Sequence, residues 1–167
     1  NEAAILVMDG VGEWATTTAW IGNNETIKPL WEIKFPHSLG LLYSAFTSFC
    51  GFKVNSGEYK LMGLAPYGKP KYADLIKENL IDIKSDGTFR LNLDYFTFHH
   101  SFKMTNNRFS NLFGVNEREF ESEMDDIYLD IAASIQKVVN DVVLLLTKSL
   151  AEQTKIKNLC LSGGVAL

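Results

Sequence analysis

The stretch Asp9-Gly10-Val11-Gly12-Glu13 decides the fold expected for this chain, because it directly follows the apolar run Ala3 to Met8. A short, continuous apolar run that ends in a turn predicts a buried strand. Glycines placed after such a strand let the backbone approach a phosphate or a metal without interference from a Cβ atom. The carboxylate and the two glycines therefore indicate a nucleotide or metal site, although similar strings also occur in ordinary turns after a strand.

The far end of the chain repeats this pattern. Apolar residues from Asn158 to Leu161 lead into Ser162-Gly163-Gly164. In open sheets of parallel strands, ligands bind beyond the carboxyl ends of the strands. We therefore expect the two glycine turns to lie side by side and to face one ligand, with the amide groups of the second turn aimed at an anion.

The segments after the first turn predict more strands. Two runs rich in β-branched and aromatic residues, Thr16 to Ile21 and Thr26 to Phe35, are separated by Asn23-Asn24 and indicate a hairpin. Together with the first strand they predict a three-stranded meander. Pro29 places the third strand at a sheet edge or at a bulge, because proline cannot donate a ladder hydrogen bond.

Helical patterns follow at residues 39–51, 56–68, 71–80 and 125–153. Ser38 is the expected N-cap of the first helix. The second is expected to break at Gly63 and Pro66, and its glycines and charges make it a second functional candidate. In the last, the run Val142 to Leu146 is apolar on every side, which predicts burial between a sheet and other helices.

A peripheral insertion is expected at about residues 81–115. Ile81 to Ile83 and Thr88 to Leu93 flank the dipeptide Asp86-Gly87, which indicates a hairpin with a type I′ turn. Residues 94–115 are aromatic, rich in asparagine and aperiodic, which predicts an irregular excursion packed onto the body.

Length and composition limit the fold class and the kinds of partner that we expect. With 167 residues, 46% of them hydrophobic, the chain suits one globular domain built as a mixed α/β sheet covered by helices. Its net charge of −4 means that the chain has no overall excess of basic residues for binding nucleic acid or an anionic membrane surface. No apolar run is long enough to span a bilayer. Cys50 and Cys160 are expected to be reduced, buried thiols of a cytoplasmic protein. Both ends look cut, so we expect a fragment of a longer protein.

Several familiar catalytic signatures do not occur in the sequence. Leu161-Ser162-Gly163-Gly164 lacks the G-x-S-x-G elbow, and neither a Walker A motif nor a G-x-G-x-x-G opens a helix. The histidines are His37 and the adjacent pair His99-His100, a spacing that does not place two imidazoles on one helix face. The two glycine turns remain as the phosphate-binding devices.

Four ordered motifs resemble the NodU/CmcH-type O-carbamoyltransferases. These motifs are residues 7–13 (VMDGVGE), 35–43 (FPHSLGLLY), 57–68 (GEYKLMGLAPYG) and 159–167 (LCLSGGVAL). The first module of that family is similar to the tRNA threonylcarbamoyl-adenosine enzyme in the actin/hexokinase ATPase superfamily. The resemblance implies that residues 1–167 form a single lobe with the actin-like, ribonuclease H-like fold, starting at the first strand of its module.

The resemblance also implies an activity for the full-length protein. In this family a separate C-terminal domain makes carbamoyl-adenylate from carbamoyl phosphate and ATP, and the module that resembles this chain transfers the carbamoyl group to a substrate hydroxyl. Iron, with magnesium as the other option, would be held by two upstream histidines, by the aspartate at the place of Asp9, and by a later aspartate. The implied partners are carbamoyl phosphate, a hydroxyl-bearing small molecule, and the missing N-terminal lobe and C-terminal domain, with a homodimer left open.

Site residues are carried over only where the motifs match. Asp9 is the implied metal ligand, and Gly10 and Gly12 would approach the phosphate and carbamoyl groups. The remaining implied contacts are Glu58 and Lys60 near the ribose and Gly163 and Gly164 beside the adenylate. The resemblance names neither the acceptor nor a general base, and the isolated fragment is expected to be inactive.

Two alternatives stay open from the sequence. One is a sugar-kinase-like phosphotransferase on the same fold, which would transfer the γ-phosphate of ATP and ignore carbamoyl phosphate. The other is a non-catalytic nucleotide-binding or interaction module, in which the glycine turns are only structural.

Overall fold

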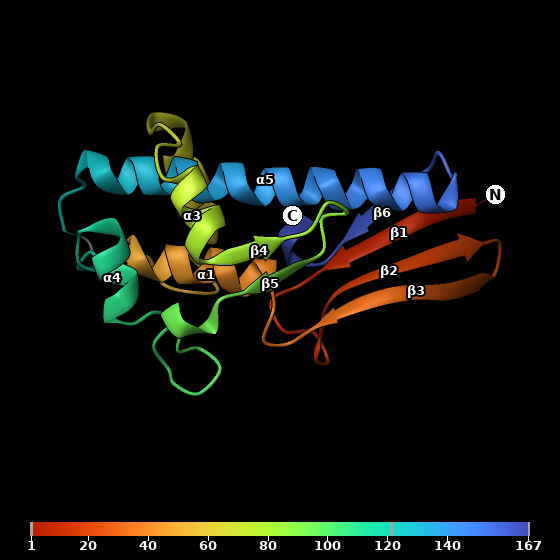
Figure 1. The fold of residues 1–167 in the computed structure, drawn as a ribbon, viewed down its shortest axis with the longest axis horizontal. Helices are drawn as coiled ribbons and strands as arrows, with labels where there is room; N and C mark the ends of the chain where they lie inside the picture. Colours follow the sequence, from red (N-terminus) through yellow and green to blue (C-terminus); the bar gives the residue numbers. More distant parts are fainter. Residues whose placement is uncertain (1, 121, 167) are drawn as a thin grey trace. The chain divides into compact units, whose positions relative to one another are not determined.

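The computed structural model describes residues 2–120 and 122–166 (Figure 1). It contains two compact units. The first consists of the described residues in 1–41, 83–90 and 141–167, and the second of those in 42–82 and 91–140. The long helix α5 (Asp126–Thr154) contributes to both units, and so does the shorter helix α1 (Leu39–Phe49).

A four-stranded mixed sheet forms the centre of the first unit. Its strands are β1 (Glu2–Met8), β2 (Ala15–Asn23), β3 (Thr26–Lys34) and β6 (Leu159–Ser162), in the order β3-β2-β1-β6. The pairs β1–β2 and β2–β3 are antiparallel, whereas β1 and β6 are parallel. The predicted meander is therefore confirmed, and so is the α/β class. Pro29 lies on the edge strand β3 at an irregularity of the ladder opposite Trp20, as its missing amide proton predicts.

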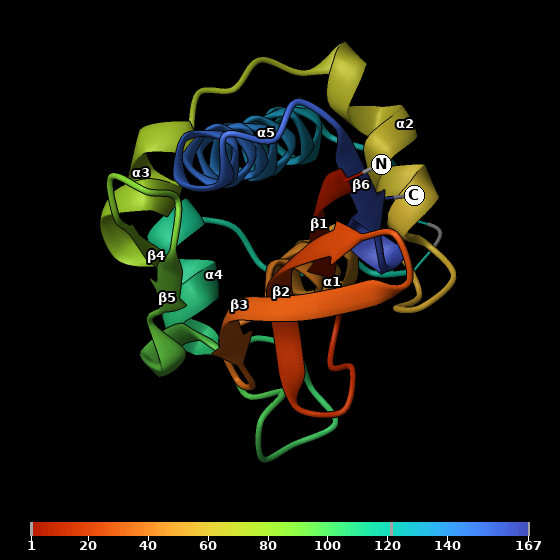
Figure 2. The same cartoon turned by 90° about the vertical axis from the view of Figure 1, so that its right-hand side faces the viewer.

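The second half of α5 runs along one face of this sheet (Figure 2). Alternate residues of β1, namely Ala4, Leu6 and Met8, are buried. Val142 and Leu146 are buried on the helix, which matches its amphipathic period. The predicted burial of the whole run Val142 to Leu146 is wrong, because Leu144 is 66% exposed.

Strand β6 is the least covered strand of the sheet, with all four residues exposed. Cys160 lies on this strand, so the prediction that it is buried is wrong. The sequence pattern gives the strand but not its position at the sheet edge, where few neighbours cover it. Cys50 is buried and unpaired, as predicted.

Helices dominate the second unit. Besides its parts of α1 and α5 it contains α2 (Glu58–Leu64), η1 (Ala65–Tyr67), α3 (Ala73–Asn79), η2 (Leu93–Tyr95) and α4 (Asn107–Phe113). The predicted break at Gly63 is wrong, since α2 continues to Leu64. The break at Pro66 is confirmed, because a 3₁₀ turn starts at Ala65.

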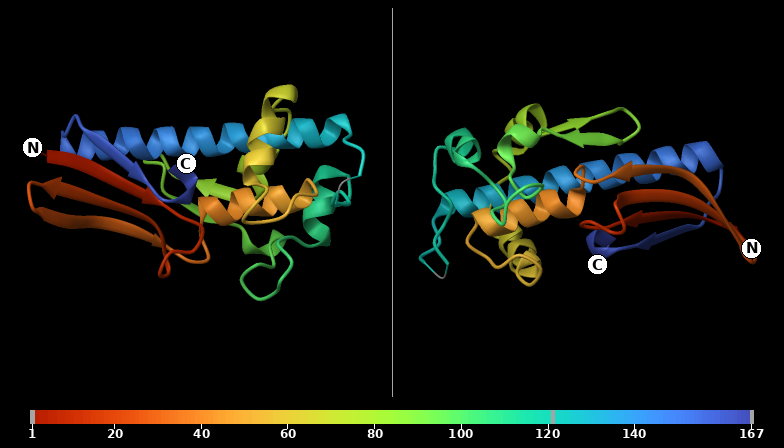
Figure 3. Two further views of the ribbon diagram at one scale, coloured as in Figure 1. Left: turned by 180° about the vertical axis from the view of Figure 1, so that it is seen from behind. Right: turned by 90° about the horizontal axis from the view of Figure 1, so that it is seen from below.

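An aromatic cluster forms the core of the second unit. Rings of Phe46 and Phe49 on α1 meet Phe109 and Phe113 on α4 with centroid separations of 4.9 to 5.8 Å. Figures 1 and 3 show α4 beside the end of α1. The prediction that residues 94–115 are irregular is thus wrong for α4, whose first turn is capped by the side chain of Asn106.

The hairpin expected in the insertion is present as β4 (Ile81–Ile83) and β5 (Phe89–Leu91). Its turn is not type I′, because Gly87 has φ +86° while Asp86 has a negative φ. One left-handed glycine closes a three-residue loop, with the Lys84 amide donating to the Thr88 carbonyl at 2.8 Å. Across residues 2–120 and 122–166, we find no helix with the length and apolar character needed to cross a membrane.

Candidate functional site

The ends of β1 and β6 bring the two predicted turns together. The strands run parallel with Val7 opposite Ser162, so the residues that follow them emerge at one edge of the sheet. There the Gly164 amide donates a hydrogen bond to the Asp9 Oδ1 atom at 2.8 Å. The expectation that the carboxylate turn and the paired-glycine turn lie side by side is therefore confirmed.

Two of the four predicted glycines are required by the backbone itself. Gly12 has φ +55° and Gly163 has φ +90°, a region that L-residues with side chains rarely adopt. A Cβ atom on Gly12 would lie 2.5 Å from the Ala15 carbonyl oxygen, and one on Gly163 would lie 2.3 Å from the Met8 carbonyl oxygen. These two glycines shape the turns.

The other two glycines leave open space. A Cβ atom on Gly10 would meet nothing within 4 Å, and one on Gly164 would reach only the Asp9 Oδ1 atom at 3.7 Å. Neither residue has a positive φ. The missing side chains at these positions thus leave room for a ligand beside the Asp9 carboxylate.

Helix α1 begins against the same turn. The Ser38 hydroxyl donates to the Asp9 carbonyl oxygen at 3.0 Å and accepts from the Leu41 amide at 3.0 Å, which confirms Ser38 as the N-cap. A Cβ atom on Gly40 would lie 2.8 Å from the Gly10 Cα atom, so only glycine allows this approach. The helix start adds a partial positive charge that favours an anion.

Gly40 was not among the predicted site residues. The sequence signal for Gly40 is its position two residues after the N-cap serine, in the first turn of a helix, where glycine is unfavourable because of its low helix propensity. The contact with Gly10 links residues that lie 30 positions apart, and no local pattern reveals such a contact.

The Asp9 carboxylate is one possible metal ligand in this part of the chain, because magnesium and iron both bind carboxylate oxygens. Its Oδ1 atom accepts the hydrogen bond from the Gly164 amide. The described residues contain no group of three histidine, cysteine or acidic side chains that could hold a metal ion. Asp9 therefore offers one carboxylate ligand, and the described residues do not place a group of three such side chains around it.

Glu58 and Lys60 lie on α2 in the second unit, and Glu58 is held by its own surroundings. Its Oε1 atom accepts from the Ser44 hydroxyl at 2.8 Å and from the Asn55 amide at 2.9 Å. These bonds fix the start of α2 next to α1 within that unit. The side chain of Lys60 is exposed.

One protein-family model covers the whole chain, and several known proteins are similar to it. The family described as carbamoyltransferase N-terminus matches residues 1–167. An uncharacterized protein of Synechocystis sp. is 61% identical over the whole chain, and the nodulation protein NolNO of Sinorhizobium fredii is 30% identical over 99% of it. The nodulation protein NolO of Bradyrhizobium diazoefficiens is 26% identical over the same share. The chain covers 27%, 23% and 28% of the lengths of these relatives, so it spans about a quarter of each.

Proposed function

The chain belongs to the carbamoyltransferase N-terminus family, and from this premise we propose that it is one lobe of an ATP-dependent O-carbamoyltransferase. The proposed reaction moves a carbamoyl group from carbamoyl-adenylate, made from carbamoyl phosphate and ATP, to a hydroxyl of a small molecule. We propose the actin-like ATPase architecture for this lobe, which agrees with its mixed sheet of three meander strands and one parallel strand.

The observation that carries the proposal is the hydrogen bond from the Gly164 amide to the Asp9 carboxylate. It joins the turns after two parallel strands at the edge where open α/β sheets bind their ligands. Gly10 and Gly164 leave open space beside this bond, and the start of α1 lies against the same turn. Backbone amides and a helix start suit the phosphate of an adenylate, because they present partial positive charge without a side chain.

We propose that Asp9 supplies one ligand to a divalent metal, iron or magnesium, with the other ligands from the rest of the full-length protein. When bound, such a cation would stabilise negative charge on a carbamoyl oxygen. The residues of this chain would then orient the donor: Gly164 fixes the Asp9 carboxylate, and Ser38 fixes the backbone of the Asp9 turn.

A ribose contact for α2 remains part of the proposal. The carboxylate of Glu58 already accepts three hydrogen bonds within its unit, the third from the Gly57 amide at 3.2 Å. We assign it the role of positioning the start of α2, and Lys60 the direct contact with the nucleotide. The enzyme would act in the cytoplasm, with its other lobe and the adenylate-forming domain on the same polypeptide.

The test uses the full-length protein with carbon-14-labelled carbamoyl phosphate, ATP and a panel of hydroxyl-bearing metabolites. Label should enter an acceptor with the wild type. Asp9→Ala should lower the rate at least about a hundredfold, as expected for loss of a group that positions the reacting centre. Lys157→Gln, which changes an exposed charge in the same unit, should keep the wild-type rate.

Three results would count against the proposal. Full transfer by a folded Asp9→Ala variant would remove Asp9 from the site. Transfer of the γ-phosphate of ATP without any use of carbamoyl phosphate would select a sugar-kinase-like phosphotransferase. If calorimetry on the complete protein detected no adenylate binding, a purely structural role of the glycine turns would be favoured.

A further inference from the structure

Trp14 has an unusual backbone conformation. It lies in the turn that joins β1 to β2, the same turn that begins with Asp9. Its φ angle is +83°, in a region that a residue with a bulky side chain rarely adopts. Such a conformation is energetically unfavourable and persists only where the surrounding structure enforces it, most often at binding and catalytic sites. Trp14 is therefore a candidate for a role in binding.

Backbone hydrogen bonds hold the turn around Trp14 in place. The Phe35 amide donates to the Trp14 carbonyl oxygen at 2.8 Å, and the Asp9 amide donates to the Thr16 carbonyl oxygen at 2.8 Å. The Ser38 hydroxyl holds the Asp9 carbonyl oxygen from the start of α1. These bonds fix the turn at the edge of the sheet where β1 ends, which is the edge that also carries the paired-glycine turn.

The side chain of Trp14 is accessible in spite of this fixed backbone, since the residue is 66% exposed. The Phe35 ring meets the indole edge-on, with centroids 5.4 Å apart and 73° between the ring planes. Val11, in the same turn, is also exposed and adds apolar surface. One aromatic ring thus supports the indole, while most of the Trp14 side chain remains open to a ligand.

The three tryptophans of the chain differ in how their indole N–H groups are used. The Trp20 Nε1 atom donates to the Thr18 Oγ1 atom at 2.7 Å, and the Trp31 Nε1 atom donates to the Gln153 Oε1 atom at 3.3 Å. Within residues 2–120 and 122–166, the structure gives the Trp14 indole no such acceptor. Because indole N–H is a donor only, Trp14 can donate to an oxygen atom of a ligand.

A ring-bearing alcohol suits this arrangement. The indole presents a broad, rigid and uncharged face, which matches the apolar face of another ring. A ring also loses less conformational freedom on binding than an open chain of the same size. The phosphate of the donor is better served by the glycine turns and the helix start, which offer partial positive charge. The indole therefore fits the acceptor of the reaction better than the donor.

We propose that Trp14 determines the specificity of the carbamoyl-transfer site by covering one face of a cyclic alcohol, the acceptor of the proposed reaction. The indole N–H donates to an oxygen atom of this acceptor, and the Phe35 ring holds the indole in place. This inference rests on the proposed function, because it assigns the acceptor of that reaction to the Asp9 turn.

Transfer kinetics of the full-length protein test the role of Trp14. Cyclohexanediol and hexanediol are the acceptor probes, because they have the same numbers of carbon atoms and hydroxyl groups and differ in the ring. Label from carbamoyl phosphate should enter cyclohexanediol with a kcat/KM at least about tenfold higher than hexanediol. Trp14→Ala should remove this preference and raise the KM for cyclohexanediol at least about tenfold, with the KM for ATP unchanged. Trp14→Phe retains a ring face, so its KM should stay within about threefold of the wild type.

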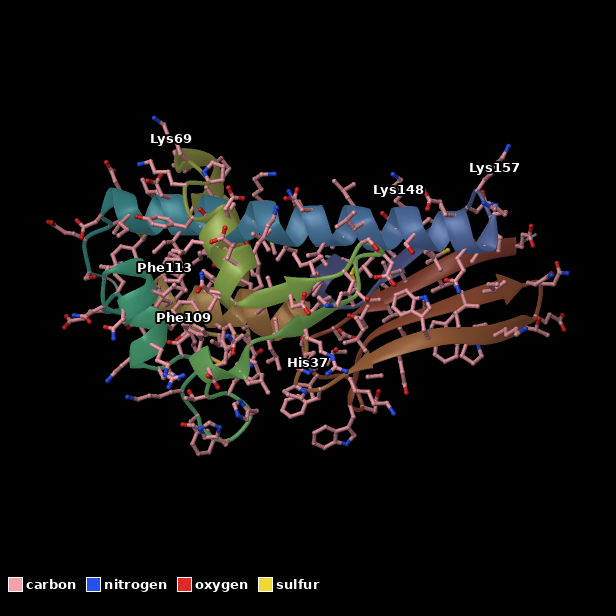
Figure 4. The ribbon with its side chains drawn as sticks, viewed as in Figure 1. His37, Lys69, Phe109, Phe113, Lys148 and Lys157 are labelled. Carbon is pink, nitrogen blue, oxygen red and sulfur yellow. The ribbon has the colours of Figure 1, made fainter. Side chains whose placement is uncertain are left out.

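Ile27→Ala is the matched control. Ile27 is 66% exposed, as Trp14 is, and belongs to the same unit, but it lies at the opposite end of the hairpin formed by β2 and β3. Lys157→Gln is a second control, since this exposed lysine lies far from His37, which follows Phe35 by two residues (Figure 4). Both variants should keep the wild-type KM for cyclohexanediol.

Fluorine NMR separates this inference from the proposed function, because it needs no carbamoyl transfer. In the full-length protein labelled with fluorotryptophan, the Trp14 resonance is the one that disappears in Trp14→Phe. Cyclohexanediol should shift this resonance more than hexanediol at the same concentration. If the shift occurred and no alcohol accepted a carbamoyl group, the proposed function would fail while ring binding at Trp14 would stand.

Four kinetic outcomes would overturn the inference: an equal kcat/KM for the two diols, an unchanged KM for cyclohexanediol in Trp14→Ala, an equal rise in the KM for ATP, or the same loss in Ile27→Ala. The NMR result decides independently, since an absent or equal shift of the Trp14 resonance by the two diols would overturn the inference whether or not transfer occurs. The NMR titration uses the wild-type protein, so it stays decisive if Trp14→Ala does not fold.

Discussion

Replacing Gly163 with alanine tests how the two turns are held together. Gly163 has φ +90°, where an alanine is strained by about 1–2 kcal/mol. Its new Cβ atom would lie 2.3 Å from the Met8 carbonyl oxygen and 2.7 Å from the Met8 carbonyl carbon. Such a backbone overlap forces a shift that typically costs about 1–3 kcal/mol.

The two effects together predict that Gly163→Ala lowers the free energy of unfolding by about 2–5 kcal/mol. This is a large part of the roughly 5–15 kcal/mol that stabilises an ordinary domain. For a chain of this length that corresponds to a fall in the melting temperature of about 5–20 °C. The fall in melting temperature is measured by thermal unfolding of the 167-residue chain, monitored by circular dichroism. Hydrogen exchange of the full-length protein should show faster exchange in β1 and β6.

Gly164→Ala is the matched control. Its Cβ atom would meet only the Asp9 Oδ1 atom at 3.7 Å, an ordinary contact, and its backbone needs no positive φ. We expect its stability to stay within about 1 kcal/mol of the wild type, since a compatible Gly to Ala change is neutral or slightly stabilising. Equal melting temperatures for Gly163→Ala and Gly164→Ala would refute the reasoning.

Three further predictions concern the core, the thiols and acid stability. Phe109→Ala should destabilise the chain by about 3–5 kcal/mol in denaturant titrations, because its ring is fully buried, whereas the fully exposed Phe102 should tolerate alanine. A thiol reagent should label Cys160 quickly in the native chain and Cys50 only on unfolding, since burial raises the pKa of Cys50 to about 12; rapid labelling of both would contradict this. A hydrogen bond from the Lys71 ammonium lowers the pKa of Asp130 below its usual value. The ionised Asp130 carboxylate therefore stabilises the folded chain above the unfolded pKa of about 3.9, and this contribution is lost as the pH falls through the folded pKa. Asp130→Asn should flatten this acid transition in a pH series of melting curves, and an unchanged pH profile would contradict the assignment.

The sequence predicts those parts of the fold that depend on local patterns. The continuous apolar run of β1, the β-branched and aromatic runs of β2 and β3, and the helical period of residues 125–153 identify most of the first unit. The closeness of Asp9 and Gly164 was also predictable, because an intervening helix favours a parallel strand returning beside the first.

The remaining features depend on contacts that a linear pattern does not contain. Helix α4 carried a usable signal, with Asn106 as cap, Gly114 as a left-handed terminator and buried Phe109 and Phe113 at helical spacing, but its seven residues sit among other aromatic residues. The exposure of Leu144 depends on which side of α5 faces the sheet. In the same way, the need for glycine at position 40 arises only from the distant Gly10.

Adenylate binding by the full-length protein tests the central claim most directly. Isothermal titration calorimetry with a non-hydrolysable carbamoyl-adenylate analogue should show binding by the wild type and by Lys157→Gln. Gly164→Val should abolish it, because the added side chain would fill the open space beside Asp9 without a strained backbone. Wild-type affinity in a folded Gly164→Val variant would contradict a ligand site between the two turns.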